Sequence, residues 1–321
     1  MENDWRPFAS INTLKRRAQL LADVRLFFAQ HQVLEVETPI LSKAAPTAPY
    51  LDSFNTDFIG LGTDHKQTYY LQTSAEFAMK RLLAAGSGSI YQIAKVFRNG
   101  ESGKAHAPEF TMLEWYRLEL SIEQLMDEVA ELLMSVAGFS DAIRLSYSAV
   151  FQQYLGLDVF ECSDERLRST GLTQMPSLAS DFELDRDGWL ELLMSEVIEP
   201  KLTELNQPVF IYDFPGAQAQ LAKLKTNELG YQVAARFELY AGGLELANGY
   251  DELLDDQELK QRFEQDNQQR QGLDKPEMPM DDKLLAAMTV GLPQCTGVAL
   301  GLDRLLMLIL EQKDISTILF E

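Results

Sequence analysis

The sequence predicts an α+β fold in which an antiparallel sheet is flanked by helices. Helical and strand patterns alternate irregularly along the chain, and the strands come in hairpins rather than in repeated strand–helix–strand units. The segment GxxxxGK[ST] does not occur, so a nucleotide site in this chain would not be a P-loop. We therefore expect an antiparallel core and not a doubly wound parallel sheet.

Start and stop signals define the elements of the N-terminal half. Ser10 is the expected N-cap of the first helix, and Gly86 is expected to end the second. Ser121 and Gln124 form a capping box for the third helix, and Gly138 stands at its exit. The expected elements are a helix from about Ile11, a Pro- and Ala-rich loop at 42–54, a helix at 75–85, a strand at 89–97 and a helix at 121–137. The apolar face of the first helix is expected to carry Ile11, Leu14, Ala18, Leu21, Val24 and Phe28.

The C-terminal half begins with a stretch at 141–206 that is mostly helical and acidic. A short strand, Val209 to Tyr212, precedes the turn DFPG, and the pattern returns to sheet over 233–250. A charged helix is expected over 251–271. We interpret residues 1–321 as one catalytic domain with a mainly helical insertion at about 141–206.

Composition excludes several classes of protein. With 321 residues, 46% of them hydrophobic, the chain can bury a large core. The 28 basic and 49 acidic residues give a formal charge of −21, which is unfavourable for tight binding to nucleic acid phosphates. Two cysteines, Cys162 and Cys295, argue against a disulfide framework and suit a reducing, cytoplasmic compartment. Neither a signal peptide nor a membrane-spanning run is expected.

The stretch 95–116 is the first candidate for a site. It reads as a strand, a polar Gly-containing loop and a second strand that ends in aromatic residues. Alternation along the strands turns Arg98, Phe110, Glu114 and Tyr116 toward one side. An arginine with carboxylates and aromatic rings suits a ligand that has a phosphate, a flat base and an amine. The alternative is a polar hairpin on the protein surface.

The stretch RFELYAGGLELANGYDEL, from Arg236 on, is the second candidate. Gly242 and Gly243 indicate a hairpin, which is expected to bring Glu238 and Glu245 opposite each other. Carboxylates held close together repel unless a cation lies between them, and such an oxygen pair suits Mg²⁺ bound to nucleotide phosphates. The alternative is two solvated glutamates on a polar face.

Three segments together carry a resemblance to a known family. FRNGESGKAHAPEFTMLEWY (97–116) resembles motif 2 of the class II aminoacyl-tRNA synthetases, in the form of the lysyl, aspartyl and asparaginyl subgroup. GVALGLDRLLML (297–308) resembles motif 3, a strand that leads into a helix beginning near Arg304. FFAQHQVLEVETPIL (27–41) resembles motif 1, which builds a homodimer interface in that family. The resemblance implies a class II synthetase-like catalytic core, and the order of the motifs makes it specific.

The first predicted helix leaves no room before it for the anticodon-binding barrel of a lysyl-type synthetase, so we expect no such barrel and no tRNA substrate. A stand-alone core with the segments ELANGYDEL, RFEQDN and CTGVALGLDRL resembles the elongation factor P–(R)-β-lysine ligase family. That resemblance implies activation of (R)-β-lysine with ATP and its transfer to a lysine side chain of elongation factor P. Two alternatives are a lysine-type ligase that acts on a free small molecule and a catalytically silent amino-acid sensor.

The resemblance also implies roles for individual residues. Arg98 and Arg304 would neutralise charge on the α-phosphate, and Glu238 and Glu245 would hold Mg²⁺ against ATP. The implied ATP-binding residues are Arg98, Asn99, Gly100, Glu101, His106, Phe110, Glu245, Leu246, Gly301 and Arg304. The implied amino-acid-binding residues are Ser74, Ala75, Glu76, Glu114, Tyr116, Asn248, Glu252 and Ala299.

Two positions depart from the lysyl-type pattern. Gly100 stands where those enzymes carry the glutamate that reads adenine, so either Glu101 or the Gly100 backbone would take that part. Ala299 stands where they usually place glycine, on the floor of the amino-acid site. We hypothesise that the added methyl group shifts preference from α-lysine toward β-lysine.

Overall fold

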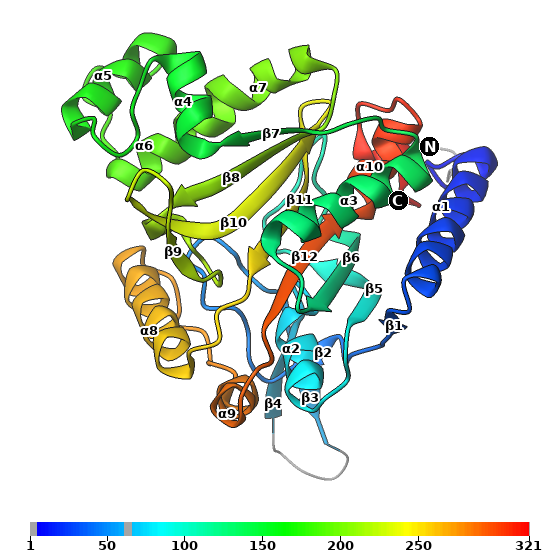
Figure 1. Ribbon diagram of the computed structural model, residues 1–321. Coiled ribbons are helices and arrows are strands. Elements are labelled where there is room, and N and C mark those ends of the chain that lie inside the picture. The colour runs from blue at the N-terminus through cyan, green and yellow to red at the C-terminus, as the bar shows by residue number, and fades with distance from the viewer. Residues whose placement is uncertain (1–4, 61–65, 321) are drawn as a thin grey trace. The chain divides into compact units, whose positions relative to one another are not determined.

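A computed structural model describes residues 5–60 and 66–320, and the chain divides into two compact units. Unit 1 comprises Met1–Leu120, Ser135–Ala137 and Leu253–Glu321, and unit 2 comprises Ser121–Met134 and Gly138–Glu252. Antiparallel strand pairs predominate in both (Figure 1). Among the described strands none closes into a barrel. The predicted α+β class is confirmed.

The sheet of unit 1 is built on the predicted hairpin. β5 pairs with β6 and β6 pairs with β12, both antiparallel, while the short β1 runs parallel to β5. These strands are β1 (Leu34–Glu35), β5 (Ile90–Phe97), β6 (Glu109–Leu118) and β12 (Cys295–Gly301). A small antiparallel sheet that the sequence did not predict consists of β2 (Leu41–Ser42), β4 (Lys66–Leu71) and β3 (Asn55–Ile59).

The helices of unit 1 come from the N-terminal and the C-terminal parts of the chain. They are α1 (Ile11–Gln30), α2 (Glu76–Ala84), α8 (Asp256–Gly272), α9 (Asp282–Val290) and α10 (Leu302–Ile309). Ser10 caps α1 as predicted, because its hydroxyl accepts from the Thr13 backbone N–H. The helix of motif 3 begins at Leu302, two residues before Arg304, and α8 begins five residues later than expected because β11 continues to Asp251.

The predicted apolar face of α1 is wrong in its first half. Ile11 is 66% exposed, whereas the buried residues are Leu20, Val24, Phe27 and Phe28. The C-terminal half of α1 alone packs on the sheet, where the Phe28 ring stacks on Tyr91 at 4.3 Å between centroids. Burial is therefore decided by where the helix meets the sheet, which its own periodicity does not specify.

Unit 2 has a sheet covered by helices on one face. Its strands are β7 (Ile143–Ser146), β8 (Val209–Pro215), β9 (Leu224–Thr226), β10 (Gln232–Ala241) and β11 (Leu244–Asp251). Its helices are α3 (Ile122–Ala137, divided between the units), α4 (Tyr147–Leu155), α5 (Asp164–Gln174), α6 (Arg186–Leu193) and α7 (Glu199–Leu202), the last preceded by a π-helical turn (Met194–Ile198). Both caps of α3 are confirmed.

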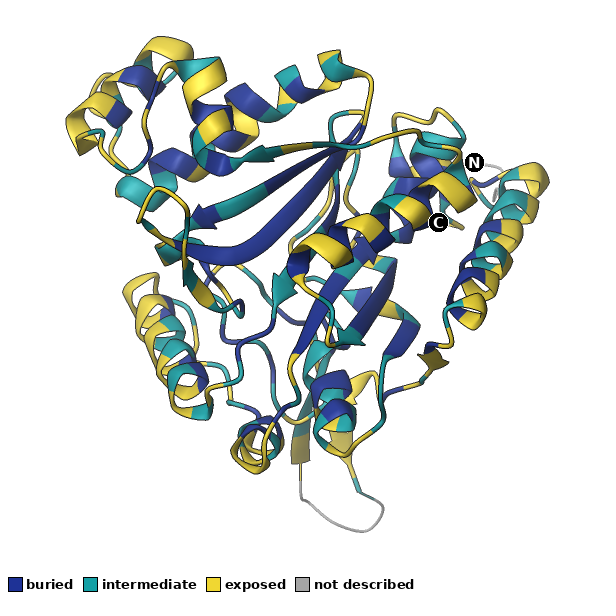
Figure 2. Cartoon of the chain, viewed as in Figure 1, coloured by how far each residue is buried: buried dark blue, intermediate teal, exposed yellow. Residues whose placement is uncertain are grey.

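The helices expected over 141–206 form a core with β8 and β10. Tyr147 and Phe151 of α4 and Trp189 of α6 are buried against strand residues such as Ile211. Figure 2 shows the resulting dark band of buried residues along β8 and β10. The strand β7, which opens this region and runs parallel to β8, was not predicted.

Candidate active site

The hairpin of β5 and β6 presents the predicted residues on one face. Phe110 lies directly opposite Val96, two residues before Arg98, and the Arg98 guanidinium lies 5.2 Å from the centroid of the Phe110 ring. Glu114 and Tyr116 follow Phe110 on the same face because alternate residues of a strand point to the same side. The predicted alternation is confirmed, and it gives this face a cation, an aromatic ring and a carboxylate.

Glu114 is the buried centre of this face. Both of its carboxylate oxygens accept from the Ser74 hydroxyl at 3.0 Å, and Oε2 also accepts from the Ala75 backbone N–H at 3.0 Å. The Tyr116 hydroxyl donates to Oε1 at 3.0 Å. Burial and the negative charge of Glu76 raise the pKa of Glu114 to about 7, and these hydrogen bonds oppose the rise. Its partners are thus neutral donors, which leaves its charge available for a cationic ligand.

Glu76 has a structural partner that the sequence did not reveal. Its Oε1 accepts from Lys80 Nζ at 2.6 Å, one turn along α2, and Lys80 is buried. The Glu76 backbone N–H donates to the Ser74 hydroxyl at 2.9 Å. The Ser74 hydroxyl therefore contacts both Glu114 and the first residue of α2, whose N-cap position is Ala75.

The floor beside Glu114 is formed by β12. Ala299 lies directly opposite Glu114 on the neighbouring strand, and Gly297 lies opposite Tyr116. Directly paired residues share a face of the sheet, with their Cβ atoms about 5 Å apart. The methyl group of Ala299 is therefore adjacent to Glu114. Gly301, an expected ATP contact, lies two residues further along the same strand, opposite Met112.

The loop between β5 and β6 is held by α10. Arg304 donates from Nε to the Ala105 carbonyl at 3.2 Å, and its Nη2 lies 2.7 Å from His106 Nε2. On the other side of the loop, the Asn99 backbone N–H donates to the Asp52 carbonyl at 2.8 Å. The three expected ATP contacts Asn99, His106 and Arg304 are thus fixed through the loop backbone or through one another.

Gly100 occupies a backbone conformation that explains the departure from the family pattern. Its φ is +87°, in the left-handed region, although a Cβ there would meet nothing within 4 Å. A side chain at this position would be strained by the backbone and not by its surroundings. The neighbouring Glu101 pairs with Arg98, the arginine expected at the α-phosphate, with 3.6 Å between its Oε1 and Arg98 Nη1.

The carboxylates of unit 2 lie on the hairpin of β10 and β11, but not in the predicted register. Glu245 is opposite Tyr240, and Glu238 is opposite Asn248. The expectation that Glu238 and Glu245 face each other directly is therefore wrong. The cause is the two-residue turn at Gly242 and Gly243, which pairs Glu245 with Tyr240, and a bulge at Leu246 then moves Glu238 from opposite Ala247 to opposite Asn248. The bulge nevertheless places Glu238, Glu245 and Asn248 on one face of the hairpin.

Glu238 is paired with a cation that sequence reasoning missed. Arg236, buried two residues earlier on β10, donates to Glu238 Oε1, and the Tyr240 hydroxyl donates to Oε2. Arg236 also donates from Nε to Asn248 Oδ1 at 3.1 Å. Burial raises the pKa of Glu238, Arg236 opposes that rise, and the charge of Glu245 adds to it. The i, i+2 spacing of Arg236 and Glu238 in a strand was the signal that could have revealed this pair.

The two carboxylates of this hairpin fit Mg²⁺ on the condition that a nucleotide supplies the remaining oxygen ligands. Glu238 and Glu245 offer hard oxygen ligands on one face and repel each other, as the pKa shift of Glu238 records. Within residues 5–60 and 66–320, no group of three or more His, Cys, Asp or Glu side chains could hold a metal. The pair therefore suits an ion that receives further oxygens from a nucleotide.

Glu252, expected at the amino-acid site, is buried just beyond β11, where its backbone forms an antiparallel bridge with Ala222.

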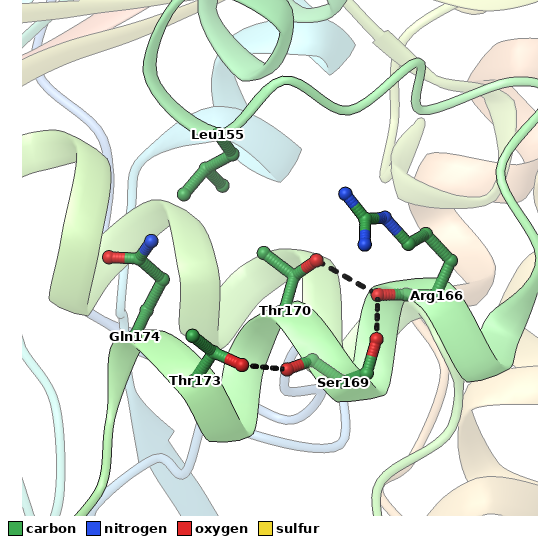
Figure 3. A pocket seen from close by; sticks show the side chains of 6 residues that line it. All are labelled: Leu155, Arg166, Ser169, Thr170, Thr173 and Gln174. Carbon is green, nitrogen blue, oxygen red and sulfur yellow. Dashed lines mark hydrogen bonds between the residues drawn. The ribbon is translucent and has the colours of Figure 1, made fainter.

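A hollow over α5 in unit 2 does not offer a second site (Figure 3). Its hydroxyl groups are used within the helix, since Ser169 and Thr170 both donate to the Arg166 carbonyl and Thr173 donates to the Ser169 carbonyl. Leu155 and Gln174 complete its lining. These hydroxyl donors are committed to the helix backbone, so we assign the hollow no role.

Comparison with known proteins shows the family to which the chain belongs. Residues 4–320 match the family model of the tRNA synthetases class II (D, K and N), and the chain belongs to this family. It is an ATP-dependent ligase of the class II synthetase type. None of the described helices is long and apolar enough to cross a membrane.

Similar curated proteins share one name. The elongation factor P--(R)-beta-lysine ligase of Proteus mirabilis (strain HI4320) is 46% identical over 316 residues, which are 98% of this chain and 96% of that protein. The protein of that name from Photorhabdus laumondii is 46% identical over 317 residues (98% and 96%), and the one from Haemophilus influenzae (strain PittGG) is 45% identical over 317 residues (99% and 97%). The resemblance stated from the sequence motifs is confirmed.

Proposed function

We propose that the protein activates (R)-β-lysine with ATP and transfers it to the ε-amine of a lysine of elongation factor P. The observation that carries the proposal is the near-complete coverage of relatives with this name at 45–46% identity. The amino-acid face supports it, because the buried Glu114 has neutral donors for partners and lies opposite Ala299. Such a carboxylate suits the ammonium group of a diamino acid.

In the first step, a carboxylate oxygen of the amino acid attacks the α-phosphorus of ATP. The bond to the bridging oxygen breaks, pyrophosphate leaves, and the product is the aminoacyl-adenylate. The carboxylate is already a nucleophile, so this step needs alignment and charge neutralisation rather than a base. Arg98 and Arg304 would stabilise the negative charge that develops on the α-phosphate, and Phe110 would stack on adenine.

Amino-acid recognition would use the residues around Glu114. Ser74, Ala75 and Tyr116 fix the Glu114 carboxylate, so a bound ammonium group would meet a pre-oriented acceptor. Glu76, Asn248 and Glu252 are the other expected contacts of the diamino acid. Mg²⁺ on Glu238 and Glu245, when bound, would neutralise the ATP phosphates.

In the second step, the acceptor amine attacks the carbonyl carbon of the mixed anhydride. An amide bond forms, the bond between the carbonyl carbon and the phosphate oxygen breaks, AMP leaves, and the amine loses a proton. The acceptor lysine of elongation factor P comes from the names of the relatives. We place the reaction in the cytoplasm, which suits two cysteines that form no disulfide.

We also propose that the protein is a homodimer through the motif 1 region. Ile11 and Leu26 of α1 and Leu34 of β1 are all more than half exposed, which is unfavourable for apolar side chains unless a second copy covers them. Light scattering coupled to size exclusion tests this, and a monomer at micromolar concentration would contradict it.

The deciding experiment for the activity is amino-acid-dependent ATP–pyrophosphate exchange with α-lysine, (R)-β-lysine and aspartate, followed by mass analysis of added elongation factor P. We expect the fastest exchange with (R)-β-lysine and a mass gain of one β-lysyl residue. Exchange without transfer would indicate a ligase for a free small molecule, and absence of exchange would indicate a silent sensor.

A further inference from the structure

Asp303 is a buried charge next to an expected catalytic residue, and the mechanism above does not use it. It lies in the first turn of α10, directly before Arg304, and is 1% exposed. Its Oδ1 accepts from Arg17 of α1, and its Oδ2 accepts from the Thr111 backbone N–H at 2.5 Å. A buried carboxylate is stable only when it is paired in this way, so these contacts fix its position.

Both contacts lead to the expected ATP contacts. Thr111 follows Phe110 on β6, so the hydrogen bond from its backbone N–H ties the start of α10 to the strand that carries the aromatic ring. Arg304, the next residue of α10, reaches the Ala105 carbonyl of the loop. The position of Asp303 therefore sets the spacing between Phe110 on the strand and Arg304 on the helix.

Arg17 reaches the same loop by a second route. It donates to the Ile318 carbonyl at 3.2 Å, at the end of the 3₁₀ turn Ile315–Ile318. At the start of that turn, the Ile315 backbone N–H donates to the Lys104 carbonyl at 2.7 Å. The helices α1 and α10 lie side by side (Figure 1). The Arg17 side chain of α1 therefore contacts both elements that bind the loop, α10 and the 3₁₀ turn.

We propose that Arg17 and Asp303 are positioning residues for ATP: they touch no substrate, and they set the places of Phe110, Arg304 and the loop between β5 and β6. The proposal rests on the proposed function, since it assumes that these groups bind ATP.

The test compares Arg17→Met, Arg17→Lys, Asp303→Asn and the double variant Arg17→Met with Asp303→Asn. Asparagine keeps an acceptor for Thr111, so the double variant removes both charges without leaving a buried carboxylate unpaired. Arg25→Met is the matched control, because Arg25 also lies on α1 and pairs with a carboxylate, Glu35, at 3.0 Å. For each variant, KM for ATP, KM for lysine, kcat of exchange and Tm are measured below the melting range.

We expect the KM for ATP to rise about tenfold in Arg17→Met and in the double variant, because misplacement of binding groups by a fraction of an ångström is costly. The KM for (R)-β-lysine should stay within about twofold of the wild-type value. Arg17→Lys should restore most of the affinity for ATP that Arg17→Met loses. The double variant should have the same KM for ATP as the single variants, as expected for coupled residues. Arg25→Met should leave all kinetic constants unchanged. A lower Tm with an unchanged KM for ATP in the double variant would overturn the proposal.

Amide hydrogen exchange separates this proposal from the proposed function. Arg17→Met should speed exchange at the Thr111 amide about tenfold or more without ATP, because the acceptor of that hydrogen bond is released. A wild-type protein that gave no pyrophosphate exchange would overturn the proposed function. In that case an unchanged rate at Thr111 would also overturn the positioning role, and a faster rate would support it.

Discussion

Glu114 in unit 1 and Glu238 in unit 2 are both buried carboxylates on hairpin strands, and they are stabilised in different ways. Glu114 is surrounded by neutral donors, and among the described residues no basic side chain forms an ion pair with it. Glu238 is paired with the buried guanidinium of Arg236 and with the hydroxyl of Tyr240. Burial raises the pKa of both carboxyl groups, and only Glu238 has a resident cation that opposes the rise.

The difference separates a binding role from a structural one. A buried carboxylate without a cation weakens the fold when it is ionised, and a cationic ligand relieves that cost. A buried carboxylate with its own arginine stabilises its surroundings and leaves an uncompensated charge behind when it is removed. Glu114 therefore has the properties of a receptor for an ammonium group, whereas Glu238 also holds unit 2 together.

The largest effect is expected for Glu238→Gln. Removing this charge leaves Arg236 buried without a counter-ion, so the free energy of unfolding should fall by about 3–5 kcal/mol. Urea denaturation measures the change, with Glu114→Gln as the comparison. A Glu238→Gln variant as stable as the wild type would show that the ion pair has no structural role.

Glu114→Gln should damage substrate binding instead of folding. Loss of the charge that is expected to meet an ammonium group should raise the KM for (R)-β-lysine about a hundredfold, which is equivalent to about 2.7 kcal/mol of binding free energy. Stability should not fall, because a buried charge without a cation is removed. Glu109→Gln is the control, since Glu109 lies on the same strand in an exposed pair with Lys95. Equal losses of stability in Glu114→Gln and Glu238→Gln would remove the contrast between the two sites.

Ala299→Gly tests the floor of the site beside Glu114. Removing the methyl group opposite this carboxylate should improve kcat/KM for α-lysine relative to (R)-β-lysine by about tenfold, as expected for one methyl group in a binding pocket. The measurement is pyrophosphate exchange with each amino acid. An unchanged ratio would exclude Ala299 as the determinant of specificity.

The smallest expected effect is the release of protons when the amino acid binds. The pKa of Glu114 in the folded protein, about 7, lies above its ordinary value of 4.5, so protonation favours folding. This contribution to stability is fully present below pH 4.5 and is lost as the pH rises through 7. A bound ammonium group favours the ionised form, so lysine binding at pH 6 should release up to about one proton, and near pH 8.5 almost none.

Calorimetry in buffers of different ionisation enthalpy measures this proton release. Glu114→Gln should abolish it. Release that is the same at pH 6 and pH 8.5, or that persists in Glu114→Gln, would show that another group titrates with binding.

Sequence reasoning worked best where chemistry is local. The caps of α1 and α3 were predicted from Ser10 and Ser121, because capping depends on neighbours within one turn. The common face of Arg98, Phe110 and Glu114 followed from the period of a strand, which the backbone imposes. The family was recognised because its motifs are contiguous segments in a fixed order.

Sequence reasoning failed where partners are distant or the register is irregular. The bulge at Leu246 gives Glu238 the partner Asn248 instead of Ala247, and no residue type near it indicates an extra residue in the strand. The network of Arg17, Asp303 and Thr111 joins residues up to 286 positions apart, which periodicity cannot connect. The buried half of α1 was likewise decided by the sheet on which it packs.

The sequence by itself determined the fold class and the family, and it predicted the carboxylates of the candidate site, because each depends on short-range patterns of polarity and turn chemistry. Only the tertiary structure decided which of those carboxylates has a resident cation. The reason is physical: the charge state of a buried group depends on desolvation and on every charge within a few ångströms, and those neighbours are assembled by folding.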